Sequence, residues 1–175
     1  MNYHNITYPD QNNGDGLRVV LWVSGCSHHC KNCQNPQTWN PENGIIFDAN
    51  AEKEILNELG HTYISGITFS GGDPLYAKNL ETVEKLINEI RVSLPNKTIW
   101  LYTGYTWEYI FNNKSDTTLE NTIRQRIISM CDVVIDGEYI DKLRNITLHW
   151  RGSSNQRVIN VKESLKHNQI ILWES

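Results

Sequence analysis

Short apolar runs of strand length alternate along this chain with longer segments in which apolar residues recur at helical spacing. The apolar runs cover residues 17–23, 66–70, 98–102 and 133–135, and we predict a β-strand in each. Helical spacing covers residues 51–59, 79–94 and 118–130, where we predict helices, with Asp48 or Asn50 as the N-cap of the first. Residues 157–161 and 169–173 are weaker strand candidates.

Strands and helices that alternate in this order predict an α/β fold with a mainly parallel sheet, because each helix forms the right-handed crossover between two parallel strands. A closed barrel of eight strands typically needs about 250 residues, whereas this chain has 175. We therefore predict one domain over residues 1–175, in which the curved sheet stays open as a partial (β/α) barrel.

A short polar segment that contains glycine follows each of the four predicted strands. These segments are residues 25–33, 70–74, 103–105 and 136–138. In parallel α/β folds, the loops that follow the strands gather at one end of the sheet and form the site. We therefore expect the four segments to face one another.

The first of these segments holds Cys26, Cys30 and Cys33 in the spacing C-x3-C-x2-C. A structural zinc site normally uses four protein ligands, whereas each of the four irons of a cubic iron–sulfur cluster needs one ligand beyond its sulfides. Three cysteines would leave one iron open for chemistry. A zinc site completed by His28 or His29 remains an alternative at this stage.

The segment Gly-Gly-Asp-Pro at residues 71–74 is either an ordinary turn or the edge of a ligand site. Glycines after a strand let a ligand approach the main chain closely. Pro74 favours an extended Asp73, whose carbonyl we expect to be free to accept a hydrogen bond. Such a carbonyl-rich edge suits an ammonium group.

Composition narrows the function classes. The net charge of −4 and the lack of a basic run argue against a nucleic-acid partner. No apolar stretch is long enough to span a membrane, and the first residues do not have the pattern of a signal peptide. We therefore expect a cytoplasmic protein, in a compartment where clustered thiols bind metal more often than they form disulfides. Cys131 lies in an apolar segment and is expected to be a buried thiol.

The cysteine loop after the first strand and the Gly-Gly-Asp-Pro segment after the next resemble the radical S-adenosylmethionine superfamily. Within it, the chain is similar to the activating proteins of the anaerobic (class III) ribonucleoside-triphosphate reductase. The matching segments lie in residues 1–3, 13–18, 23–26, 66–75, 100–105, 134–137 and 150–157. Two positions depart from the pattern: Asn32 replaces an aromatic residue found in many members, and Gln34 replaces a frequent tyrosine.

The resemblance implies a radical S-adenosylmethionine type of partial barrel with one 4Fe-4S cluster. Cys26, Cys30 and Cys33 would ligate three of its irons. The amino nitrogen and carboxylate of S-adenosylmethionine would chelate the fourth. The main chain at Asn32, Cys33 and Gln34 would border the adenosyl group.

Further contacts with S-adenosylmethionine are implied on the other loops. Gly71, Gly72 and Asp73 would receive the methionyl ammonium, and Thr103 and Asp136 are additional candidate contacts. A Gly72→Val change is then expected to leave iron content near normal and to weaken binding of S-adenosylmethionine, because the side chain would take the space of the methionyl group.

The implied activity is reductive cleavage of S-adenosylmethionine to a 5′-deoxyadenosyl radical, which removes hydrogen from a glycine Cα of the partner. The implied partners are the large subunit of the anaerobic reductase and a low-potential electron donor such as flavodoxin. This chemistry needs no general acid or base, so no catalytic side chain is predicted, and His28 and His29 are expected to be solvated or to lie near the cluster. The alternatives are a superfamily enzyme that activates another glycyl-radical enzyme or modifies a small molecule, and a zinc-binding interaction module.

Overall fold

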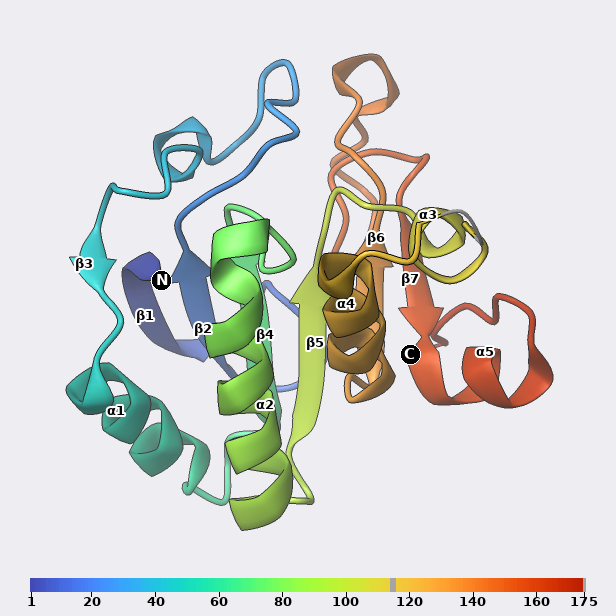
Figure 1. Ribbon diagram of the computed structural model, residues 1–175. Coiled ribbons are helices and arrows are strands. Elements are labelled where there is room, and N and C mark those ends of the chain that lie inside the picture. The colour runs from blue at the N-terminus through green and yellow to red at the C-terminus, as the bar shows by residue number, and fades with distance from the viewer. Residues whose placement is uncertain (114–115, 175) are drawn as a thin grey trace.

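The computed structural model, which describes residues 1–113 and 116–174, is an α/β structure with one seven-stranded sheet of order β3-β1-β2-β4-β5-β6-β7 (Figure 1). The strands are β1 (Asn2–Asp10), β2 (Arg18–Val23), β3 (Ile45–Ile46), β4 (Gly66–Gly71), β5 (Thr98–Tyr102), β6 (Val133–Asp136) and β7 (Arg157–Asn160). The α-helices are α1 (Ala49–Leu59), α2 (Leu80–Ser93), α3 (Trp107–Phe111), α4 (Leu119–Ser129) and α5 (Val161–His167). None of the helices in these residues has both the length and the apolar surface needed to cross a membrane.

The sheet has a parallel centre and antiparallel edges. Strands β2, β4, β5 and β6 pair in parallel. Strand β1 pairs antiparallel with β2 and β3, and β7 pairs antiparallel with β6. The predicted α/β fold with an open sheet is confirmed, but the sheet is mixed, because the chain adds antiparallel strands that need no crossover helix.

The four main predicted strands and the three predicted helices are confirmed. Asp48 is the N-cap of α1, where its carboxylate accepts hydrogen bonds from the amides of Asn50 and Ala51. The candidate at 157–161 becomes β7, followed by α5, which the pattern does not predict. Residues 169–173 do not form a strand: they contact β7 through an isolated bridge and the hydrogen bonds Asn160 N–Ile171 O and Trp173 N–Val158 O.

The pattern also misses β1, because polar residues dominate it and its alternation is broken. Tyr3 and Ile6 are its buried side chains, three positions apart. The pairing with β2 shifts register between Tyr3 and Asn5. Such a bulge sends the following residues to the opposite face, so a search for a period of two fails here.

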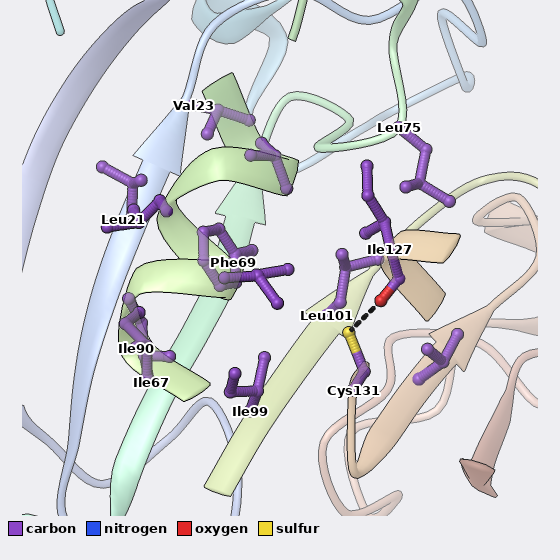
Figure 2. Packing of buried hydrophobic residues seen from close by; sticks show 14 of the residues in the cluster. Leu21, Val23, Ile67, Phe69, Leu75, Ile90, Ile99, Leu101, Ile127 and Cys131 are labelled. Carbon is purple, nitrogen blue, oxygen red and sulfur yellow. Dashed lines mark hydrogen bonds between the residues drawn. The ribbon is translucent and has the colours of Figure 1, made fainter. Parts of the chain in front are cut away.

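Helices α1, α2 and α4 cover one face of the sheet (Figure 1). The main core lies between these helices and the sheet. Side chains of β2, β4 and β5 such as Leu21, Phe69 and Leu101 lie close to those of α2 and α4 (Figure 2). Cys131 is fully buried in this core, and its thiol donates to the carbonyl of Ile127 at 3.3 Å (Figure 2). The prediction of a buried thiol is confirmed.

The opposite face carries a smaller cluster around Trp100. Arg18, at the amino end of β2, is fully buried there with its guanidinium 5.2 Å from the ring centroid of Trp100. It donates to the hydroxyl of Thr68 and to the carbonyls of Ile67 and Thr98. Burial lowers the pKa of Arg18 to about 10. This residue fills the end of the sheet opposite to the cysteine loop.

Asp132, which directly precedes β6, joins several elements. Its Oδ2 accepts from the amide of Ile99 at 2.8 Å and from the guanidinium of Arg91 at 2.7 Å. Its Oδ1 lies 2.7 Å from the ammonium of Lys162. Burial alone would raise the pKa of Asp132, but these partners lower it overall.

An Asp132→Asn change should therefore lower the free energy of unfolding of the metal-free protein by about 2 kcal/mol at neutral pH. Because the folded pKa lies below the unfolded value of about 3.9, the charge stabilises the fold above that value and stops doing so as pH falls through the folded pKa. Urea unfolding over a pH series should show the difference between parent and variant shrinking in acid. A difference that is the same at every pH would contradict this assignment. Lys162→Met, at a mostly exposed partner, is the control and should change stability by less than about 1 kcal/mol.

Candidate metal centre and ligand site

The loops that follow β2, β4, β5 and β6 line one cavity of about 380 Å³ at the carboxyl end of the parallel strands. The expectation that these loops face one another is confirmed. The predicted site residues on the cavity wall are Cys26, Cys30, Cys33, Gln34, Gly71, Gly72, Asp73 and Thr103.

Asn32 and Asp136 do not line this cavity, and their side chains are bonded to other residues of the protein. Asn32 donates through its side-chain amide to Asp141 Oδ2 at 2.9 Å. Asp136 is buried, and its carboxylate accepts from the amide of Trp107 at 2.8 Å and from the guanidinium of Arg157. The carboxylate of Asp136 is therefore occupied by the fold, and a ligand contact from either residue stays a prediction.

The cysteine loop leaves β2 through Gly25, whose φ of +98° lies in the region that favours glycine. The loop is then fixed by main-chain hydrogen bonds to the 3-10 turn Pro36–Thr38 and the residue after it. Gly25 donates to the carbonyl of Thr38 at 2.7 Å, and Cys26 donates to that of Trp39 at 3.1 Å. The first cysteine, Cys26, is thus held in place by main-chain hydrogen bonds to the segment that follows the cysteine loop.

Cys26, Cys30 and Cys33 are free thiols, each partly exposed on the cavity wall. Burial, with a smaller effect of Asp73, raises the pKa of Cys26 to about 11, so its thiolate form needs the positive charge of a metal centre. In the described part of the chain, no three His, Cys, Asp or Glu side chains are arranged to hold a single metal ion. Each iron of a cubic cluster takes one ligand beyond its sulfides, so the three free thiols on this cavity wall fit an iron–sulfur cluster.

His28 lies between two of the cysteines, but it is not solvated: its side chain is 11% exposed. Its Nε2 lies 2.9 Å from Asp73 Oδ2, and its Nδ1 lies 2.9 Å from Glu138 Oε1. A ring that carried a proton on each nitrogen would donate to both carboxylates. Burial lowers the pKa of His28, but the bonds to Asp73 and Glu138 raise it overall. Both nitrogens are occupied, which leaves none to complete a zinc site.

His29, in contrast, is exposed, and its ring lies 4.9 Å from that of Trp39. Of the two histidines, His28 is the functional candidate that the sequence pattern misses. The sequence places His28 on one strand-end loop and Asp73 and Glu138 on two others, but only the structure shows that the three side chains meet.

The carboxylate of Asp73 points into the protein and is 2% exposed. Oδ1 accepts from the amide of Leu75 at 2.8 Å. Oδ2 accepts from the hydroxyl of Thr103 and the amide of Gly104, each at 3.0 Å, and from His28. These hydrogen bonds hold the loops after β2, β4 and β5 together. The hydroxyl of Thr103 is one of the donors and is therefore already in use.

The prediction of a free carbonyl at Asp73 is wrong. This carbonyl accepts from the amide of Tyr76 at 2.9 Å and from the side-chain amide of Asn79 at 3.0 Å, because the chain turns into the helical segment that precedes α2. The main chain of Gly71 and Gly72 remains the candidate contact for an ammonium group.

The expectation for Gly72→Val also fails on this geometry. A Cβ at Gly72 would lie 2.5 Å from the carbonyl oxygen of Gly25 and 3.1 Å from that of Thr38. The added side chain would therefore meet the main chain of the cysteine loop rather than the ligand alone. Glycine is required at this position so that the loops after β2 and β4 can approach each other.

Residues 148–156 form another wall of the cavity. Gln156 holds this wall: its Oε1 accepts from the amides of Gly152 and Ser153, and its Nε2 donates to the carbonyl of Gly137 at 3.0 Å. Arg151 donates to the carbonyl of Gln156. The sequence assigns no role to residues 151–157, and the structure gives several of them a part in the cavity wall.

Known proteins resemble this chain over most of its length. It is 44% identical to the anaerobic ribonucleoside-triphosphate reductase-activating protein of Enterobacteria phage T4 over 158 residues, which cover 90% of this chain and 93% of the phage protein. It is 38% identical to the protein of that name from Escherichia coli strain K12 over 164 residues, 93% of this chain and 100% of the relative. The protein of that name from Haemophilus influenzae is 37% identical over 164 residues, 93% of this chain and 99% of the relative. The chain belongs to this family of activating proteins.

Residues 12–159 also match a domain family described as "4Fe-4S single cluster domain". This range contains all three loop cysteines and the other loops around the cavity. For this activating-protein family member, the match favours an iron–sulfur cluster over the zinc alternative.

Replacement of Cys26, Cys30 or Cys33 by Ala should abolish a complete cluster, because each removes a ligand from the cavity wall. Cys131→Ala should retain the brown colour, since this thiol lies in the core and contacts Ile127. Iron and acid-labile sulfide are measured after anaerobic reconstitution of each variant. If Cys131 were as necessary as the loop cysteines, a site with four cysteines would replace the one described.

Gly72→Val should lower iron content and also lower the free energy of unfolding by roughly 2 kcal/mol, because the side chain forces the Gly25 carbonyl away. Gly60→Ala, at an exposed position with the ordinary helical φ of −63°, is the control. Reconstitution and urea unfolding measure both effects. Normal iron content in a folded Gly72→Val protein would contradict the packing argument.

Proposed function

We propose that this protein activates the anaerobic ribonucleoside-triphosphate reductase by generating a glycyl radical on its large subunit, as a radical S-adenosylmethionine enzyme. The observation that carries the proposal is a shared cavity. Three free cysteines of one loop line the same cavity as the glycines at the end of β4. Three ligands fit a cluster with one open iron, and the glycine edge fits a ligand beside it. Membership in the activating-protein family supports the reductase as the target.

In this proposal, Cys26, Cys30 and Cys33 hold the 4Fe-4S cluster. When bound, the cluster supplies the electron that cleaves S-adenosylmethionine to methionine and a 5′-deoxyadenosyl radical. Gly71 and Gly72 offer main chain to the methionyl ammonium, without side chains that would keep the ligand away. The main chain at Cys33 and Gln34, with that of Asn32, borders the adenosyl group. A low-potential donor such as flavodoxin reduces the cluster.

The open sheet supports a macromolecular target. The cavity is walled by loops, and the parallel centre of the sheet ends in antiparallel edge strands rather than closing into a barrel. A peptide loop that carries the target glycine therefore has a route to the cavity. An enzyme for a small metabolite, the main alternative, usually buries most of its ligand's surface.

The test is anaerobic incubation of the reconstituted protein with S-adenosylmethionine, a reductant and the reductase labelled with deuterium at glycine Cα. Deuterium should appear in 5′-deoxyadenosine, and electron paramagnetic resonance should show a glycyl radical on the reductase. The Cys30→Ala variant is the control and should give neither product. Formation of 5′-deoxyadenosine without any glycyl radical would rule out the activating role.

A further inference from the structure

The imidazole of His28 occupies a slot between the loops rather than an open surface. A Cβ at Gly104 would lie 2.4 Å from Cδ2 of His28, so the ring uses the space that this glycine leaves free. A second contact is with Tyr105, whose ring meets that of His28 edge to face, with the two centroids 4.7 Å apart. Packing therefore restricts the ring orientation in addition to its hydrogen bonds.

Each contact of the ring comes from a different strand-end loop. The cysteine loop after β2 carries His28, Asp73 lies after β4, Gly104 and Tyr105 lie after β5, and Glu138 lies after β6. One side chain thus connects the four loops that follow the parallel strands. The connection is made at the middle of the segment that separates the first two cysteines.

We propose that His28 is a positioning residue that fixes the cysteine loop against the loops after β4 and β6. Through this contact it sets how Cys26 and Cys30 present the cluster to the glycine edge at Gly72. The inference rests on the proposed function and adds to it a residue that acts through its neighbours. Groups that orient the ligands of a metal centre typically change affinity or activity by about tenfold to 100-fold when replaced.

The test compares His28→Asn with His29→Asn, the same change one residue apart in the same loop. His29 is exposed and has a φ of +49°, a region that asparagine tolerates well. Both variants keep the three cysteines, so both should take up iron and sulfide near the parent level. The affinity for S-adenosylmethionine is read from the change it causes in the electron paramagnetic resonance spectrum of the reduced cluster.

We expect His28→Asn to need about tenfold more S-adenosylmethionine for this spectral change, while His29→Asn matches the parent. In the metal-free proteins, hydrogen exchange over residues 26–33 and at the amide of Gly104 should be faster in His28→Asn alone, because Asp73 loses a partner. Parent-like affinity and parent-like exchange in His28→Asn would overturn the proposal.

A second variant, Gly104→Ala, leaves the histidine in place and moves its ring. It should reproduce the loss of affinity, since the added methyl group would overlap the imidazole. If His28→Asn fails to fold, this variant decides, and parent-like affinity in it overturns the proposal. Failure of the proposed function is distinguishable, because then the parent protein itself would show no spectral change with S-adenosylmethionine.

Discussion

The close approach of two main-chain segments, the loop after β2 and the loop after β4, is the constraint on which the site depends. The parallel strands end side by side at Val23 and Gly71. The pairing then continues beyond the sheet, since Gly72 donates to Val23 and Asp73 donates to Gly25, each at 2.8 Å. Only residues without side chains fit where these segments meet, because a Cβ at Gly72 would overlap the Gly25 carbonyl. The cysteine loop and the glycine edge are thereby placed on one cavity before any ligand binds.

The buried carboxylate of Asp73 extends this constraint to the neighbouring loops. A buried carboxylate is strongly destabilising unless donors surround it, and here the donors come from its own loop, from the loop after β5 and from His28. His28 in turn contacts Glu138 on the loop after β6. The acidic residue of the Gly-Gly-Asp-Pro segment is therefore a structural centre of the site, and its carboxylate oxygens already accept hydrogen bonds from Leu75, Thr103 and Gly104 and contact His28.

The parts of the fold and site that follow from local pattern could be predicted, and those that depend on tertiary contacts could not. Apolar runs give the parallel strands, and parallel topology then places all four loops at one end, which the cavity confirms. Strand β1 is not predicted, because a bulge breaks the alternation of its buried and exposed side chains. The sequence predicts a free carbonyl at Asp73, because nothing in it shows that the main-chain amide of Tyr76 and the side-chain amide of Asn79 donate to this carbonyl. The role of His28 likewise depends on loops that lie far apart in sequence.

The partners of the acidic side chains around the cavity are relevant to the chemistry that the site could perform. In the described residues around the cavity, acidic groups of the strand-end loops have partners within the protein. Asp73 contacts His28 and main-chain amides, Asp136 contacts Arg157 and Trp107, and the more exposed Glu138 contacts His28. These hydrogen bonds satisfy the carboxylates within the protein. The cavity wall also offers three thiols and glycine main chain. Under the proposed function this arrangement is coherent, because the cluster carries the redox chemistry and the protein contributes placement of the cofactors.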